Sequence, residues 1–262
     1  MGQDAARSLL WTQFILCRAV ARVGNACVRD GAGSQTGKTG LPFCYTDTHA
    51  GTGHLPVTAE LRHFMEQVRA EAGGFQKAVL CDALAGFTDG TWHPGSWLLA
   101  GRVLGGIAGL DLEIDVNDID PEAIARARLN RAPEIWARFW LHDWFLFLRS
   151  RLALPRPPQF VFIDPSPTDA RGPSYAIDAA ILLDTMAVPY MVTYTLGAPQ
   201  EAIDQIGRSG LELMWPDGGC GVLLGGGAEG VLLEILPDLR RLAGLLGGDF
   251  ITRLPTVADY TI

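Results

Sequence analysis

PFCYTDTHAGTG, residues 42–53, joins a short apolar run to a glycine turn. The run ends in Asp47, and the turn that follows carries Gly51 and Gly53. In an α/β protein a first buried strand brings a ligand to its carboxyl edge in this way, because glycines let backbone N–H groups approach the ligand closely. The stretch therefore predicts that the chain binds a nucleoside-like cofactor.

Strand-like and helix-like segments alternate along the rest of the chain. Apolar runs of strand length lie at residues 43–46, 112–116, 138–141, 159–163, 190–194, 221–224 and 250–253. Helical patterns lie between most of them, at residues 96–107, 121–130, 175–186, 199–209 and 231–246. This alternation predicts an α/β, Rossmann-like fold with a mostly parallel seven-stranded sheet and helices on both faces. Such sheets bind ligands at the carboxyl ends of their strands.

Two parts of the chain stand outside this alternation. Residues 1–41 are expected to form an N-terminal amphipathic helix and a Gly-rich linker, ahead of a main domain at residues 42–262. Residues 54–94 form an inserted, largely helical segment between the first strand and its partner helix, which begins after Pro94-Gly95-Ser96. The insertion either shapes the mouth of the site or is a surface excursion.

The composition favours one soluble globular protein of the cytoplasm. The chain has 262 residues, 48% of them hydrophobic, and a formal net charge of −8, so a polynucleotide substrate would need a local basic patch. Five cysteines without a CxxC pattern predict neither disulfides nor a zinc site, and no metal is expected. The apolar residues 9–17 resemble a signal peptide, but Asp4, Gln13 and Arg18 favour an amphipathic helix instead. No run is long enough to span a membrane.

Two other glycine-rich stretches match nucleotide-binding patterns. Residues 32–39, AGSQTGKT, satisfy a relaxed phosphate-loop pattern, and nucleoside triphosphate hydrolysis through Lys38 is one hypothesis. Residues 225–230, GGGAEG, match the dinucleotide fingerprint. The first stretch lacks a preceding strand and a following helix, and the second lacks an acidic residue at the end of the next strand. We interpret them as a linker and a strand-to-helix turn.

Acidic or polar residues follow four of the expected strands in order. Asp47 ends the first strand and Asp118 the next, where a carboxylate can accept two ribose hydroxyl hydrogen bonds. Asp143, with Trp144 beside it, follows the third strand and can receive the exocyclic amine of an adenine. Asp164 follows the fourth. The alternative is that each is only a helix N-cap or a turn former.

The order DTHAGTG, HPGSW, NDIDP, HDWF and FIDPSP, over residues 42–224, resembles S-adenosylmethionine-dependent methyltransferases. It is most similar to the RlmJ family, which methylates an adenine exocyclic amine in large-subunit ribosomal RNA, and less similar to three-Cys-motif partner proteins. The resemblance implies S-adenosyl-L-methionine as cofactor. The cofactor-binding residues of the matching motifs are Asp47, His49, Gly51, Gly53, Ser96, Asp118, Asp143 and Trp144. The resembled fold also ends in an antiparallel hairpin, which would place residues 250–253 beside residues 220–224.

The catalytic residues that the resemblance implies are Asp164, Pro165 and Ser166. Asp164 and the Pro165 carbonyl would hydrogen-bond an acceptor amine, and Ser166 would add a polar contact. The family's DPPY is here DPSP, without the ring that stacks on a flipped base, and Trp97, Trp144 or Tyr194 either replaces that ring or belongs to the core.

The resulting hypothesis is N-methylation of a nucleobase amine, in RNA or DNA, or of a comparable small polar acceptor. The partner is therefore a nucleic acid or a small molecule, and the sequence leaves the oligomeric state open. The alternative is a weakened relative that binds S-adenosylmethionine or S-adenosylhomocysteine in a structural or regulatory role. The other histidines, His54, His63 and His93, are expected to have surface or turn roles.

Overall fold

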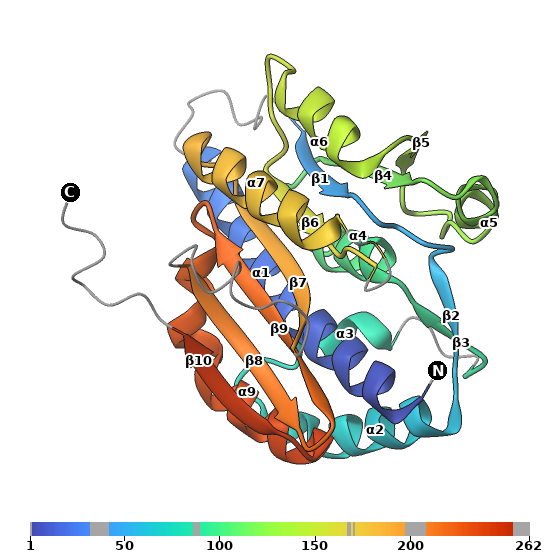
Figure 1. The fold of residues 1–262 in the computed structure, drawn as a ribbon, viewed down its shortest axis with the longest axis vertical. Coiled ribbons are helices and arrows are strands. Elements are labelled where there is room, and N and C mark those ends of the chain that lie inside the picture. Colours follow the sequence, from blue (N-terminus) through green and yellow to red (C-terminus); the bar gives the residue numbers. More distant parts are fainter. Residues whose placement is uncertain are drawn as a thin grey trace. The chain divides into compact units, whose positions relative to one another are not determined.

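In a computed structural model, the described part of the chain combines one long N-terminal helix with ten strands and a set of shorter helices (Figure 1). The structure describes residues 2–31, 42–85, 90–166, 169, 171–196 and 208–253. The chain divides into two compact units, which we take in turn. Unit 1 comprises Met1–Thr12, Thr58–Lys77 and Ile163–Ile262, and unit 2 comprises Gln13–Val57 and Ala78–Phe162.

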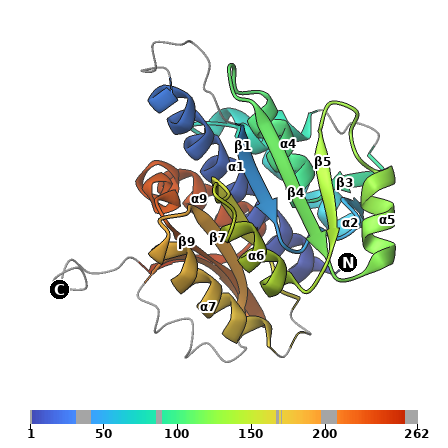
Figure 2. The ribbon, with the colours of Figure 1, turned by 90° about the horizontal axis from the view of Figure 1, so that it is seen from above.

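Unit 2 contains a four-stranded parallel sheet. Its strands are β1 (Phe43–Asp47), β4 (Leu112–Asp118), β5 (Ala137–Leu141) and β6 (Phe160–Ile163, of which the first three residues belong to unit 2). β1 pairs with β4 on one side and with β6 on the other, and β4 pairs with β5. Figure 2 shows β1, β4 and β5 side by side. The predicted Rossmann-like parallel arrangement is confirmed here.

Helices cover both faces of this sheet. They are α4 (Ser96–Gly105), α5 (Pro121–Leu129) and α6 (Trp144–Leu152). Successive strand residues point to opposite faces, and β5 shows this directly. Phe139 contacts Trp97 of α4, with ring centroids 5.7 Å apart, whereas Trp140 contacts Phe147 of α6 at 6.1 Å. α4 and α6 therefore lie on opposite faces, as expected.

The strand order in unit 2 creates a topological switch point. The chain moves outward from β1 to β4 and then β5, and returns to place β6 on the other side of β1. The connections above β1 consequently diverge to either side of it. In open α/β sheets, ligands bind outside the carboxyl ends of the strands at such a point. The loop after β1 occupies this position.

The insertion begins and ends in a two-stranded ribbon within unit 2. β2 (His54–Pro56) pairs antiparallel with β3 (Trp92–Pro94), with His54 opposite Pro94. The Gly95 N–H donates a 2.7 Å hydrogen bond to the Gly53 carbonyl. The ribbon therefore brings the end of the DTHAGTG turn next to the start of α4. Of the helices in the insertion, α3 (Val79–Leu84) belongs to unit 2 and α2 (Ala59–Ala70) to unit 1.

The N-terminal helix α1 (Gln3–Gly31) belongs to unit 1 as far as Thr12 and to unit 2 from Gln13 onward. In unit 2 its Gln13 side chain donates to the Pro94 carbonyl at 2.8 Å and contacts Nε2 of His93 at 2.6 Å. His93 has no exposed surface, so the surface or turn role expected for it is wrong. A polar residue on the buried side of α1 thus anchors the ribbon.

Unit 1 is built on four antiparallel strands, in the order β10-β8-β9-β7. They are β7 (Tyr190–Leu196), β8 (Ser209–Trp215), β9 (Gly218–Gly225) and β10 (Asp249–Arg253). β8 lies between β9 and β10, as Figure 1 shows. The predicted hairpin is therefore wrong, because Phe250 pairs with Leu213 of β8 and not with residues 220–224. β8 was not predicted, so the large sheet has eight strands and not seven.

Unit 1 contains several helices besides the first part of α1, and specific hydrogen bonds tie its elements together. These helices are α2, η1 (Ala72–Gly74), α7 (Gly172–Thr185), η2 (Ala228–Val231) and α9 (Leu232–Leu246). The Gln76 N–H donates to the buried Asp238 carboxylate of α9 at 2.9 Å. Trp11 Nε1 donates to the Leu211 carbonyl at 3.3 Å, which ties the start of α1 to β8.

The two glycine motifs have different outcomes. Residues 225–230 form a strand-to-helix turn between β9 and η2, as expected, with Gly226 and Gly227 at φ 62° and 104°. Such positive φ values favour glycine, which accounts for the motif without a dinucleotide. Residues 32–39, with Lys38, lie outside the described residues, as does most of the predicted helix at 199–209.

Candidate functional site

Asp47, the last residue of β1, is the centre of the loop at the switch point. Its side chain has no exposed surface. Oδ1 accepts a 3.1 Å hydrogen bond from the His49 N–H, and Oδ2 accepts from the Ser96 hydroxyl at 2.5 Å and from the Tyr45 hydroxyl at 3.3 Å. A buried carboxylate is stable only when such partners replace water. Asp47 thus holds the DTHAG turn and the PGS turn together rather than facing a ligand freely.

The glycine turn is held by Asp118 at the end of β4. Oδ2 of Asp118 accepts a 2.9 Å hydrogen bond from the Gly51 N–H, and Oδ1 accepts from the Asp120 N–H at 2.9 Å. Each carboxylate oxygen has a second lone pair, so this half-buried group keeps acceptor capacity. Gly51 has φ 54°, and a Cβ built there meets no atom within 4 Å. The turn is therefore open beside a fixed carboxylate.

The His49 side chain contacts two neighbouring residues, Thr48 and Trp144. Its Nδ1 is 2.8 Å from the Thr48 hydroxyl, which also donates to the Phe162 carbonyl of β6 at 3.1 Å. Its ring lies 5.0 Å from the buried Trp144 ring at the start of α6. The loop therefore contacts both β6 and α6.

Asn117 joins the ends of β4 and β5 and was not predicted from the sequence. It is fully buried, and its side-chain Nδ2 donates to the carbonyls of Thr48 and His142 at 3.3 and 3.1 Å. Its Oδ1 accepts from the His142 N–H at 3.1 Å. Because both Nδ2 and Oδ1 of this buried amide are hydrogen-bonded, Asn117 sets the spacing between the loop after β1 and the loop after β5. The sequence signal was a polar residue inside an apolar strand.

Asp143 performs the local role that was weighed as the alternative. Oδ1 caps α6 by accepting from the N–H groups of Phe145 and Leu146 at 3.1 and 3.0 Å. An N-cap carboxylate satisfies two donors that the helix leaves open. Within the described residues, Oδ2 has no hydrogen-bond partner, so one oxygen of Asp143 can still receive an amine.

Gly53 has a packing requirement in addition to its turn geometry. Its φ is 75°, and a Cβ at this position would lie 2.7 Å from Cζ2 of Trp97. Trp97 is fully buried, which places it in the core and not in a stacking role. The glycine is needed because the indole of α4 lies directly against the turn.

All eight residues predicted to bind the cofactor lie in unit 2. Short contacts join Asp47 to His49 and Ser96, Gly51 to Asp118, and His49 to Trp144. The three predicted catalytic residues, Asp164, Pro165 and Ser166, follow β6 and lie in unit 1. There, Asp164 and Pro165 line a cavity of about 370 Å³. Most of the cavity's other polar lining consists of the hydroxyl-bearing residues Ser8, Thr12, Thr193, Tyr194 and Thr195, together with Asp4.

The surroundings of Asp164 raise the pKa of its carboxyl group above the ordinary value. Its side chain keeps exposed surface, but the protein atoms around the carboxyl group displace water from the charged form and raise its pKa. A hydrogen bond from the Thr193 hydroxyl opposes this and lowers the pKa. Tyr194, half-buried in the same cavity, donates to Oε1 of the buried Glu212 at 2.8 Å. One of the three candidate aromatic rings therefore lies beside Asp164 and Pro165.

Two further features are absent from the described residues. No group of three or more histidine, cysteine, aspartate or glutamate side chains could hold a metal ion among them. Within the same residues, no helix is both long and apolar enough to cross a membrane.

Comparisons with known proteins reach only the fold. No family model matches the chain, and no curated protein matches it. The crystal structure of protein LPL1258 from Legionella pneumophila str. Philadelphia 1, described under the family model DUF519, matches with a TM-score of 0.72 at 15% identity, over 94% of this chain and 98% of that chain. This likeness shows a common fold.

Two further solved structures are more distant. A probable spermidine synthase from Corynebacterium glutamicum has a TM-score of 0.41 at 10% identity, over 94% of this chain and 82% of its own. A putative rRNA-methylase from Clostridium thermocellum has a TM-score of 0.36 at 12% identity, over 77% of this chain and 95% of its own.

Proposed function

We propose that the protein is an S-adenosylmethionine-dependent methyltransferase. The observation that carries the proposal is the 2.9 Å hydrogen bond from the Gly51 N–H to Asp118. It joins an open glycine turn after β1 to a carboxylate at the end of β4, at the switch point of a parallel sheet. A nucleoside cofactor needs this pair of features, a backbone that can be approached closely and an acceptor for its ribose.

The residues of unit 2 fit this cofactor. The remaining lone pairs of Asp118 are available to the ribose hydroxyls, and Oδ2 of Asp143 to the adenine amine. The open space beside Gly51 leaves room for the amino-acid end, next to His49 and Ser96. Asp47, in contrast, is proposed to position the loop, because its oxygens are taken up inside the protein.

The acceptor is proposed to bind at Asp164 in the cavity of unit 1. The cofactor supplies an electrophilic methyl group on a sulfonium, and the protein has to align the acceptor for in-line displacement. Asp164 and the Pro165 carbonyl would accept hydrogen bonds from an amine and orient its lone pair.

The lining of the cavity favours a small polar acceptor over a polynucleotide. It contains two carboxylates, Asp4 and Asp164, and no basic side chain among the described residues. Nucleic-acid binding depends on cations that pair with phosphates, and these are missing from the lining. Methylation of a nucleobase amine in RNA, as in the RlmJ family, is therefore the less favoured form of the proposal.

The test is a calorimetric titration with S-adenosylmethionine, followed by transfer of a labelled methyl group to separate pools of small amines, RNA and DNA. The proposal expects saturable binding and label in at least one pool. Absence of cofactor binding would contradict it. Asp164→Asn serves as the matched variant, because it keeps the shape of the side chain and removes its charge. This variant should bind the cofactor normally and transfer the methyl group slowly.

A second candidate is a protein that binds the cofactor without methyl transfer. It is favoured by the DPSP sequence, which lacks the aromatic ring of DPPY. Tyr194 lines the same cavity and supplies an aromatic ring there, which supports catalysis instead. Binding of S-adenosylmethionine with no transfer to any pool, and with equal affinity for S-adenosylhomocysteine, would favour the second candidate.

A further inference from the structure

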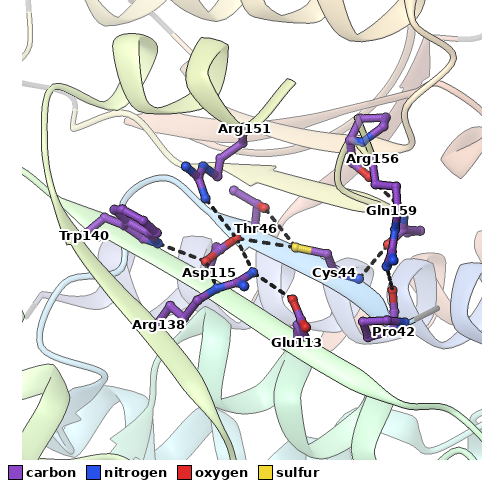
Figure 3. Close-up of polar contacts among 11 residues, drawn as sticks. Pro42, Cys44, Thr46, Glu113, Asp115, Arg138, Trp140, Arg151, Arg156 and Gln159 are labelled. Carbon is purple, nitrogen blue, oxygen red and sulfur yellow. Dashed lines mark hydrogen bonds and ion pairs between the residues drawn. The ribbon is translucent and has the colours of Figure 1, made fainter. Parts of the chain in front are cut away.

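A cluster of polar and charged residues, drawn in Figure 3, lies near the amino ends of the parallel strands in unit 2. The proposed cofactor loop follows the opposite, carboxyl end of β1. Cys44 pairs with Glu113 near the start of β1 and β4, and Asp115 pairs with Arg138 at the start of β5. These side chains alternate with apolar residues along their strands, so they share one face of the sheet. The proposed methyl transfer uses none of them.

Asp115 is the buried centre of the cluster. Its side chain is 1% exposed. It accepts hydrogen bonds from Nε and Nη2 of Arg138 at 2.7 and 2.9 Å, and from Nε1 of Trp140 at 2.9 Å. This bidentate pair fixes the guanidinium plane and raises the pKa of Arg138, so that its charge is permanent. Nη1 of Arg138 has no hydrogen-bond partner within the described residues.

Arg151 of α6 places a second guanidinium beside the first. It lies over the Trp140 ring at 4.3 Å, and its Nη1 is 3.9 Å from Oδ2 of Asp115. The side chain is only 14% exposed. Its Nη2 has no hydrogen-bond partner in the part of the chain that is described. Burying a guanidinium against an aromatic ring costs free energy when some of its N–H donors have no hydrogen-bond partner. This arrangement points to a ligand.

The two guanidiniums face a cavity of about 410 Å³, which Arg156 also lines. The nearest Arg156 contact is a long one, 3.5 Å from Nη2 to the Pro42 carbonyl. The lining of the cavity therefore contains three arginines and two carboxylates, Asp115 and Glu113. Both carboxylates already pair with Arg138. The Cys44 thiol adds no charge, since burial and the nearby Asp115 raise its pKa to about 12. The cavity therefore presents a net positive charge in a chain of formal charge −8.

Apart from Gln159, whose side chain bonds the Cys44 N–H and the Pro157 carbonyl, the rest of the wall is apolar and sets the size of the ligand. It is formed by Pro42, Leu154, Pro155, Pro157 and Pro158. The cavity exceeds what an inorganic anion needs, so an organic group has room against these side chains. A phosphate monoester carries close to two negative charges at neutral pH, which matches two guanidiniums with free donors better than a single carboxylate would.

We propose that this cavity binds a small phosphate ester, with its phosphate between Arg138 and Arg151 and its organic part against the proline wall. Guanidinium groups suit this ligand better than lysine ammonium groups would, because their planar forks bind phosphate oxygens in pairs. The site is separate from the proposed cofactor site and does not depend on methyl transfer.

The proposal is tested by calorimetric titration of the full chain with inorganic phosphate, ribose 5-phosphate and ribose. We expect ribose 5-phosphate to bind more tightly than inorganic phosphate, and ribose not to bind. Arg151→Gln should weaken ribose 5-phosphate binding at least about tenfold, since it removes charge-assisted hydrogen bonds to the phosphate. Arg149→Gln is the matched control, because this exposed arginine of the same helix does not line the cavity.

Arg156→Gln gives a second variant, whose exposed side chain can be changed without disturbing Asp115. It should also weaken binding. The proposal is overturned if ribose 5-phosphate does not bind at millimolar concentration, if ribose binds equally well, or if Arg149→Gln has the same effect as Arg151→Gln. Tighter binding of a single-stranded RNA than of ribose 5-phosphate, lost in Arg151→Gln and Arg156→Gln, would instead assign the cavity to a polynucleotide.

Discussion

The hydroxyl of Ser96 donates a 2.5 Å hydrogen bond to Oδ2 of Asp47, a residue 49 positions earlier in the chain. The intervening insertion makes this possible, because its ends pair as β2 and β3 and set Gly53 against Gly95. Two short motifs that are distant in sequence therefore form one structure at the carboxyl edge of the sheet. The proposed cofactor site depends on this contact.

Ser96→Ala should weaken S-adenosylmethionine binding by about tenfold. The change removes a hydrogen bond to a buried carboxylate, which contributes about 1.5–3 kcal/mol, and releases the start of α4 from the turn. Calorimetric titration measures the effect. Ser150→Ala is the control, because that hydroxyl donates to the Phe147 carbonyl within α6, away from the turn. Equal affinities in the two variants would show that Ser96 does not organise the site.

Gly53→Ala and Gly51→Ala should differ in stability although both glycines have positive φ. Alanine at Gly53 adds a clash with Trp97 to the backbone strain, so we expect a loss of about 3 kcal/mol in the free energy of unfolding. Alanine at Gly51 meets open space, and we expect a loss of about 1 kcal/mol. Urea unfolding compares them. A larger loss at Gly51 than at Gly53 would contradict the packing described for the turn.

Gln13→Leu should destabilise the protein by about 2–4 kcal/mol. It leaves His93 Nε2 and the Pro94 carbonyl, both buried, without the amide that now bonds them. Thermal unfolding of the variant is compared with that of Asn25→Ala, which changes an exposed residue of the same helix and should lie within about 0.5 kcal/mol of the wild type. If Gln13→Leu leaves the stability unchanged, Gln13 of α1 does not anchor the ribbon.

Thr193→Val should shift the ionisation of Asp164 to higher pH. The Thr193 hydroxyl stabilises the carboxylate and lowers its pKa, against burial, which raises it. Without the hydroxyl the pKa rises further, and the acidic limb of any methyl transfer that needs the carboxylate moves to higher pH. Carboxyl NMR titration detects the shift independently of activity. Thr195→Val, in the same cavity, should leave the pKa unchanged, and a downward shift in Thr193→Val would refute the assignment.

The parallel half of the fold follows from local sequence signals. Each strand of unit 2 contains consecutive or alternating apolar residues and has a polar residue at or just after its end. Of the helices between these strands, α4 and α5 match the predicted helical patterns at residues 96–107 and 121–130, whereas α6 was not predicted. β8 was missed although Leu211, Leu213 and Trp215 alternate with Glu212 and Met214, because the preceding segment suggested a helix through residue 209. Its insertion between β9 and β10 depends on pairing between distant segments, which a single sequence does not reveal.

The sequence named several residues that lie around the loop after β1, but not the local roles that the structure gives them. Motif order identified Asp47 and Asp118, yet burial makes Asp47 a support for the loop and leaves acceptor capacity on Asp118. Asn117 was overlooked because an amide inside an apolar strand has no motif of its own. The Asp115 and Arg151 cluster was also invisible, since its members come from separate elements and meet only in the folded sheet.

Calorimetric titration of wild type, Asp118→Ala and Asp120→Ala with S-adenosylmethionine tests the central claim most directly. The Asp118 side chain holds the glycine turn and faces the proposed ribose position, whereas the Asp120 side chain caps α5. We predict one cofactor per wild-type chain, affinity at least about tenfold weaker in Asp118→Ala, and affinity close to wild type in Asp120→Ala. Failure of the wild type to bind, or unaltered affinity in Asp118→Ala, would contradict the claim that this loop is a cofactor site.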